Sequence, residues 1–140
     1  MKPSRDVKPF MDITNKLGLN PFKTVVSCPI ASAGGYGGAM GPAQFIPSTW
    51  VLYTSRITKL TGSNPPSPWN PKDAFIASAL LLTDNGADGQ TYDTEWTAAM
   101  KYFAGSNWKK AAFRFYGDDV MAIAKKYQDQ ITLLQSLAVR

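Results

Sequence analysis

Residues Gly38–Trp50 read GAMGPAQFIPSTW, and they follow another glycine-rich run, GGYG, at residues 34–37. Glycine allows backbone conformations that other residues rarely adopt, whereas proline restricts the backbone. Proline is also favoured at the first position of a helix, so the stretch predicts a shaped loop that runs into a helix at Pro47 or Ser48. Composition alone leaves open whether this loop only connects two elements or forms the wall of a binding site.

The residues after the loop repeat with the period of a helix. Side chains that can share one helix face recur at spacings of four and three, at Trp50, Thr54, Ile57 and Leu60. Gly62 is placed to end this helix. The next stretch, SNPPSPWNP at residues 63–71, contains four prolines and predicts a surface loop with a restricted backbone. At its end Asn70 can cap a further helix, with Pro71 at the first helical position.

Apolar periodicity and turn residues predict the remaining helices. The segments expected to be helical are Ser4–Leu17, Pro71–Asn85, Asp93–Gly105, Asn107–Gly117 and the run that starts at Asp118. The first should pack through Val7, Phe10, Met11 and Leu17, and the last through Val120, Ala124, Tyr127, Ile131 and Leu134. The segment Pro71–Asn85 is apolar on several sides and should be the central helix. Extended patterns are limited to short pieces such as KTVVS at residues 23–27, so we expect a mostly α fold and a single domain over residues 1–140.

Composition excludes several kinds of chemistry. The chain of 140 residues carries a net charge of +5, has no histidine and has one cysteine, Cys28. Ser-His and Cys-His catalysis and His/Cys zinc sites are therefore excluded, and we expect neither a metal nor a cofactor. No apolar run is long enough to span a membrane, and no basic block with interleaved aromatic residues indicates nucleic-acid binding. Cys28 is interpreted as a small buried residue, or alternatively as half of a disulfide whose partner lies outside this chain.

Carboxyl groups are the natural candidates for catalysis in a chain without histidine. Helix starts and glycine turns explain most of them, namely Asp73, Asp84, Asp88, Asp93, Glu95, Asp118 and Asp119. No two carboxyl groups form an evident pair of acid and nucleophile. The residues by themselves therefore do not reveal a catalyst.

Aromatic and amide side chains predict a carbohydrate-binding surface more directly. An aromatic ring presents a flat apolar face to the C–H groups of a sugar, and an amide such as that of Gln44 can bond to sugar hydroxyls. Among the tryptophans we expect Trp50 and Trp96 to lie in the core. Trp69, in the proline-rich loop, should be the most exposed.

Three elements in the same order along the chain resemble lytic transglycosylases, the lysozyme-like enzymes that cleave peptidoglycan, and most closely their membrane-bound B type. GAMGPAQFIPSTW is similar to that family's Gly-x-x-Gly-x-x-Gln-Phe-x-Pro-Ser signature. NPKDAFIASALLLTDNG (Asn70–Gly86) resembles the family's next helix, and AAMKYFAG (Ala98–Gly105) resembles the AAYNAG element that carries an active-site tyrosine. The resemblance covers about Gly34–Gly105 and implies a lysozyme-like helical domain of the goose type.

The resemblance also implies a reaction. In the family one glutamic acid protonates the oxygen that links N-acetylmuramic acid to N-acetylglucosamine. The same carboxylate then takes the proton of the muramoyl 6-hydroxyl, which attacks C1 of its own sugar and leaves a 1,6-anhydromuramoyl end. One carboxylate is enough for this chemistry, where other glycosidases use two.

Carried over by position, the resemblance implies a set of substrate-binding residues. Those residues are Gly38, Met40, Gly41, Gln44, Phe45, Tyr102 and Phe103. Gly38, Met40 and Gly41 would form the wall beside the cleaved bond. Gln44 would face the substrate, and Tyr102 would support the catalytic acid. Phe103 stands where the commoner family pattern has asparagine, so the sugar hydrogen bond of that site does not carry over.

The family's catalytic glutamate precedes the glycine-rich signature, usually in a Glu-Ser pair. Residues 1–37 contain no glutamate and only two aspartates, Asp6 and Asp12, while Glu95 follows the signature. We therefore expect the acid, and the helix that carries it, to lie upstream of Met1. One alternative is a domain that has lost its acid and only binds glycan. Another is a helical scaffold without a binding site.

Family membership would further imply peptidoglycan glycan strands as the partner and a location outside the cytoplasmic membrane, in the periplasm or the cell wall. We expect a monomer. An export signal is not evident, because the first residues, MKPSRDVKPFMD, have no apolar core.

Overall fold

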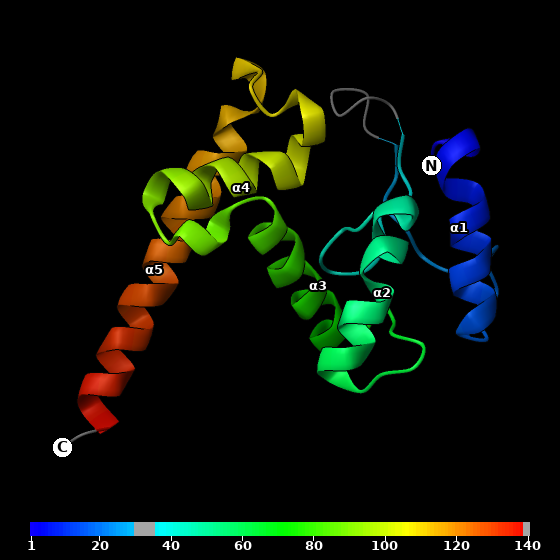
Figure 1. The fold of residues 1–140 in the computed structure, drawn as a ribbon, viewed down its shortest axis with the longest axis horizontal. Helices are drawn as coiled ribbons and strands as arrows, with labels where there is room; N and C mark the ends of the chain where they lie inside the picture. The colour runs from blue at the N-terminus through cyan, green and yellow to red at the C-terminus, as the bar shows by residue number, and fades with distance from the viewer. Residues whose placement is uncertain (30–35, 139–140) are drawn as a thin grey trace. The chain divides into compact units, whose positions relative to one another are not determined.

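The structure of the chain, a computed structural model, describes residues 1–29 and 36–138. These residues form five α-helices joined by loops and short 3₁₀ turns (Figure 1). The helices are α1 (Pro3–Lys16), α2 (Pro47–Thr61), α3 (Pro71–Asp84), α4 (Tyr92–Ala104) and α5 (Arg114–Ala138), and the 3₁₀ turns are η2 (Ala87–Gly89), η3 (Gly105–Asn107) and η4 (Ala111–Phe113). Extended structure in this part of the chain is limited to isolated bridges, so the prediction of a mostly α fold is confirmed.

Contacts along the chain define two compact units, Met1–Leu80 and Leu81–Arg140. We call them the first and the second unit and describe each by itself. The expected single domain over residues 1–140 stays a prediction. None of the helices in the described residues is both long enough and apolar enough to cross a membrane.

In the first unit, α1 and α2 lie side by side (Figure 1). The buried residues of α1 are Asp6, Phe10, Ile13 and Thr14. The predicted face is therefore wrong in part, since Val7 is 42% exposed. The buried face of α1 includes two polar residues, Asp6 and Thr14, which hydrophobic periodicity does not predict to be buried. Thr14 can be buried because its hydroxyl donates to the carbonyl oxygen of Phe10 over 2.9 Å.

The helix boundaries of the first unit follow the predicted signals. α2 begins at Pro47, and Gly62 ends it with φ +80°. Asn70 caps α3, because its Oδ1 accepts the backbone N–H groups of Lys72 and Asp73 over 2.9 and 3.3 Å. α3 is not the buried central helix expected, because the side chain of Phe75 is 63% exposed.

The predicted burial is correct for Trp50 but not for Trp96, Trp69 or Cys28. Trp50 is fully buried, as expected, whereas Trp96 is only half-buried. Trp69 is half-buried rather than exposed, because its indole Nε1 donates to the carbonyl oxygen of Val25 over 3.1 Å and holds the ring against the loop. Cys28 is a free, exposed thiol, so its interpretation as a buried residue is wrong.

In the second unit α4 packs against the beginning of α5 (Figure 1). A capping box between Thr91 and Thr94 starts α4. The predicted helix end at Gly117 is wrong, because α5 runs through this residue. Gly117 is buried against α4, where a Cβ atom would lie 2.6 Å from Nε1 of Trp96 and 3.0 Å from Cγ of Met100. Glycine is present here to admit the indole ring and not to stop a helix.

We predict that Gly117→Ala destabilises the protein although alanine is the better helix former. The added methyl group must displace Trp96, whose Nε1 donates to Asp118 over 2.8 Å. The expected loss is about 1–3 kcal/mol of unfolding free energy, measured by urea denaturation. The same substitution in a Trp96→Leu background should cost less, since the clashing ring is gone. An increase in stability on Gly117→Ala alone would contradict this packing.

Candidate functional site

The glycine-rich signature forms a tight turn in the first unit. The backbone N–H of Met40 donates to the carbonyl oxygen of Phe45 over 2.8 Å, and the N–H of Gln44 donates to the carbonyl oxygen of Gly41 over 3.2 Å. An isolated bridge also joins Met40 to Val26, so KTVVS contributes a short extended contact as expected. The turn is thus tied to the preceding loop on one side and continues into α2 on the other.

The glycines of the turn are required by close approach within the protein. Gly41 has φ +62°, and a Cβ atom there would collide with the carbonyl oxygen of Pro68 in the proline-rich loop. Gly38 has φ +100°, and a Cβ atom there would collide with Met1. Both positions therefore need glycine for conformation and for packing. Their role as a wall beside a bound sugar stays a prediction.

Gln44 is the unusual residue of the turn. It is exposed and adopts φ +56°, a left-handed conformation that is uncommon for residues other than glycine. Its side-chain Nε2 donates to the carbonyl oxygen of Gly41 over 2.8 Å, which fixes the amide over the turn. An exposed polar group held in a strained backbone conformation is typical of functional sites.

Two of the predicted substrate-binding residues, Met40 and Phe45, pack in the core beneath the turn. Met40 is 0% and Phe45 3% exposed. The ring of Phe45 makes edge contacts with Trp50 and Tyr53 at centroid distances of 5.6 and 6.2 Å. The observed role of Met40 and Phe45 is therefore in the core beneath the turn. Their contact with a substrate stays a prediction.

Tyr102 and Phe103 lie in the second unit, near the end of α4. Tyr102 is half-buried, and Phe103 is 40% exposed. The ring of Phe103 stacks on Tyr116 at 4.5 Å and makes an edge contact with Phe115 at 5.7 Å. Burial raises the pKa of the Tyr116 hydroxyl, so this group stays neutral at physiological pH. A site shared by these residues and the glycine-rich turn stays a prediction, because the turn belongs to the first unit.

The carboxylate of Asp6 contacts the signature, which was not predicted because Asp6 lies on α1, far from the signature along the chain. Its side chain is 1% exposed, and its Oδ1 accepts the backbone N–H of Ser48 over 3.3 Å at the start of α2. Ile46 at the N-cap offers no side-chain hydrogen bond, so Asp6 of α1 performs the capping instead. Arg5 pairs with the other oxygen, Oδ2, over 2.7 Å.

The environment of Asp6 keeps it ionised. Burial by itself would raise the pKa of this carboxyl group. The hydrogen bonds from Arg5 and Ser48, together with the charge of Arg5, outweigh burial and lower the pKa below its ordinary value. A carboxyl group that holds its proton this weakly is unsuited to act as a general acid near neutral pH.

Asp12, Asp73 and Glu95 occupy positions that the local structure explains. Asp12 is exposed and pairs with Lys8 over 2.7 Å. Asp73 is buried, and it accepts the Ser63 hydroxyl over 2.8 Å and the backbone N–H of Ser67 over 2.9 Å, which closes the proline-rich loop onto α3. Glu95 is exposed in the first turn of α4, as predicted. The described residues contain no group of three or more His, Cys, Asp or Glu side chains arranged to bind a metal ion.

A hollow of about 710 Å³ opens in the first unit between α1, α2 and the proline-rich loop. Its lining residues are Asp12, Ile13, Lys16, Leu17, Trp50, Val51, Thr54, Ser55, Thr58, Asn64, Pro65 and Pro66. Of the signature only Trp50 contributes, and none of the predicted substrate-binding residues does. The hollow is therefore distinct from the glycine-rich turn.

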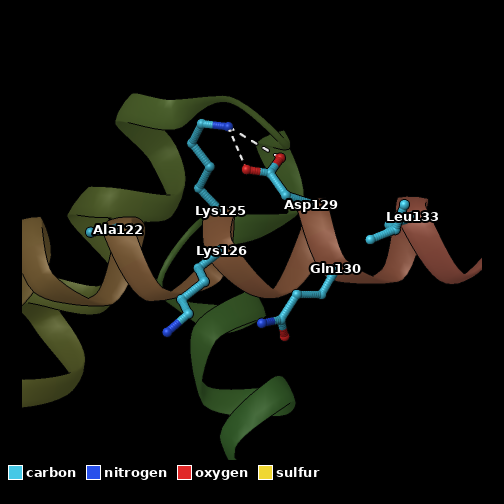
Figure 2. Close-up of a pocket in the computed structure, with 6 residues that line it drawn as sticks. All are labelled: Ala122, Lys125, Lys126, Asp129, Gln130 and Leu133. Carbon is cyan, nitrogen blue, oxygen red and sulfur yellow. Dashed lines mark hydrogen bonds and ion pairs between the residues drawn. The ribbon is translucent and has the colours of Figure 1, made fainter.

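A second hollow, of about 410 Å³, runs along α5 (Figure 2). All of its lining residues belong to that one helix, and no other element closes it. Lys125 and Asp129 face each other across one turn of the helix and form an ion pair of 2.8 Å. This is the open side of a helix and not a ligand pocket.

Comparisons of this chain with protein-family models, with curated proteins and with solved structures found no match. The function of this chain therefore has to be inferred from the signature and from the geometry of its residues.

We predict that removal of the Asp6 side chain weakens the first unit in a pH-dependent way. Asp6→Ala should lower the unfolding free energy at pH 7 by about 1–3 kcal/mol, the usual range for hydrogen bonds to a buried charged group. Asp12→Ala is the matched control on the same helix, and it should change stability by no more than about 0.5 kcal/mol because its ion pair is exposed. Urea denaturation of both variants measures the difference.

The sign of the pH effect follows from the lowered pKa of Asp6. Stabilisation by the ionised form is complete above the unfolded value of 3.8 and is lost as pH falls through the lower folded value. The difference between the wild type and Asp6→Asn should therefore be constant from about pH 7 to 5 and shrink below about pH 4. A difference that grows on acidification would contradict the ionised cap.

Proposed function

We propose that this chain binds peptidoglycan glycan strands as the lysozyme-like domain of a lytic transglycosylase. The proposal is supported by the three ordered elements that resemble this family. The single observation that carries it is the fixed turn, with Gln44 exposed and held in a left-handed conformation. This conformation costs about 1–3 kcal/mol, and at Gln44 a side-chain hydrogen bond to the carbonyl oxygen of Gly41 fixes the amide over the turn.

The turn is well suited to sugar binding because it is already ordered. Its backbone is fixed by the Met40–Phe45 hydrogen bond and by the approach of Gly41 to Pro68. An amide presented by such a turn loses little conformational entropy when a ligand binds. Sugar hydroxyls are both donors and acceptors, so the two ends of the Gln44 amide can each bond to one.

Cleavage needs a carboxylic acid that is protonated before the reaction starts. Asp6 does not meet this need, since its pKa is lowered and its oxygens are bonded to Arg5 and Ser48. Glu95 is exposed in the first turn of α4, so it lacks the buried, apolar surroundings that such an acid requires. Formation of 1,6-anhydromuramoyl ends therefore requires a buried glutamic acid besides Asp6 and Glu95. The second candidate function is a module that binds glycan without cleaving it. It is favoured because Asp6 caps α2 and so does not serve as an acid.

The substrate determines where such a protein would work. Peptidoglycan lies outside the cytoplasmic membrane, so we propose that the chain acts in the periplasm or the cell wall. No metal or cofactor is part of the proposed reaction.

We predict that the chain is retained by insoluble peptidoglycan and that Gln44→Ala reduces this retention about tenfold or more, as expected when a hydrogen-bonding side chain at a ligand is removed. Gln90→Ala is the matched control, because Gln90 is also an exposed glutamine with positive φ, +51°. Co-sedimentation with purified sacculi measures both variants. Equal retention of the two variants would contradict a role of Gln44 in binding.

The reaction is tested separately by a search for anhydromuropeptides after incubation with purified peptidoglycan. We expect retention without anhydro products from this chain. Anhydro products that disappear in Glu95→Gln would show that Glu95 is the acid and would contradict the structural role assigned to it.

A further inference from the structure

The second half of α5 is a helix without a partner in its own unit. Gly117 is buried against α4, and Val120 and Met121 are half-buried, but residues 122–138 are all exposed. This segment is about 25 Å long at 1.5 Å per residue. In proteins most helical stability comes from the packing of an apolar face, so a helical segment whose apolar side chains are exposed points to a packing partner.

The apolar side chains of this segment follow the repeat of a coiled coil. They occur at spacings of 4, 3, 4, 3 and 4, at Val120, Ala124, Tyr127, Ile131, Leu134 and Ala138. Each pair of steps, one of four and one of three, spans a heptad of seven residues, and a heptad repeat keeps a seam in contact with a second, supercoiled helix. The larger side chains are open to solvent, with exposed fractions of 61% for Tyr127, 46% for Ile131 and 65% for Leu134.

The residues that flank the seam carry no charge. In a heptad lettered a to g, Ala124 and Ile131 occupy position a, and Tyr127 and Leu134 occupy position d. The flanking e and g positions are Met121, Ile123, Gln128, Gln130, Gln135 and Leu137. Two copies of this helix therefore meet without repulsion between like charges, which is the usual obstacle to self-pairing.

The charged residues lie away from the seam. Figure 2 shows the Lys125–Asp129 ion pair on one side of α5 and Lys126 on another. Gln128 and Thr132 bond to each other within the helix, through the Thr132 hydroxyl and the Gln128 carbonyl oxygen at 2.9 Å. A helix that binds membranes carries a strongly basic polar face, whereas here one of only two lysines is neutralised by Asp129. The pattern therefore favours a helix as the partner over a lipid surface.

We propose that residues 120–138 of α5 pair with the same segment of a second copy of this chain. This homodimer replaces the monomer expected from the sequence, and it is independent of the proposed glycan binding. A pair of helices this short buries less than the roughly 1,600 Å² of a standard interface, so the dimer is weak and concentration-dependent.

Sedimentation velocity of the whole chain over a concentration series tests the pairing. The wild type should shift from monomer to dimer with rising concentration. Ile131→Asp places a charge in the seam and should raise the dimer dissociation constant about tenfold or more. Thr132→Asp is the matched control, because it adds the same charge one residue away on the polar side, and it should leave dimerisation nearly unchanged.

Two further measurements separate loss of pairing from loss of folding. Near-ultraviolet circular dichroism, to which Trp96 against Gly117 contributes, should be the same in all three proteins. Hydrogen exchange of residues 122–138 should become slower as the wild type dimerises. A wild type that stays monomeric throughout, whether this segment exchanges freely or is protected by its own chain, would overturn the proposal. Equal disruption by the two substitutions would overturn it as well.

Discussion

The carboxylate of Asp6 makes the contact on which the arrangement of the first unit depends. Helix α2 follows directly from the glycine-rich turn, and the N-cap residue, Ile46, cannot bond to the free N–H groups of the first turn. Asp6 supplies this bond from α1, and its negative charge lies at the positive end of the α2 dipole. One buried group thus fixes the position of α1, the start of α2 and the end of the turn. It can do so only while it is ionised, and Arg5 and Ser48 ensure that it is.

The same contact explains why the candidate site has a binding part and lacks an evident catalyst. A carboxyl group cannot serve both as a permanently ionised cap and as a proton donor at neutral pH. In the first unit Asp6 serves as the ionised cap. What it presents to solvent is the amide of Gln44, held by the backbone of the turn. This division of roles is why the proposed glycan binding can be tested separately from the proposed glycan cleavage.

Signals that act within a few residues along the chain were predictable from sequence. Pro47 at the start of α2, Gly62 at its end and Asn70 before α3 all act where they were expected, because each works through its own backbone or that of its neighbours. Residues that act through a distant partner were not. Asp6 had no visible role because Ser48 is far away in sequence, and Gly117 looked like a helix stop because its neighbour, Trp96, lies on another helix.

The candidate site shows the same limit. The sequence identified Gln44 and the glycines of the turn through a resemblance, but it did not show what makes glycine necessary there. At Gly41 the reason is the carbonyl oxygen of Pro68, and the loop that carries Pro68 is closed by Asp73 and anchored to Val25 through Trp69. The turn and the proline-rich loop therefore depend on each other for their shape, although Gly41 and Pro68 are 27 positions apart in the chain. A protein engineer who transplants the turn into another scaffold must transplant residues 63–73 with it, because the turn alone would lose the surface against which it is shaped.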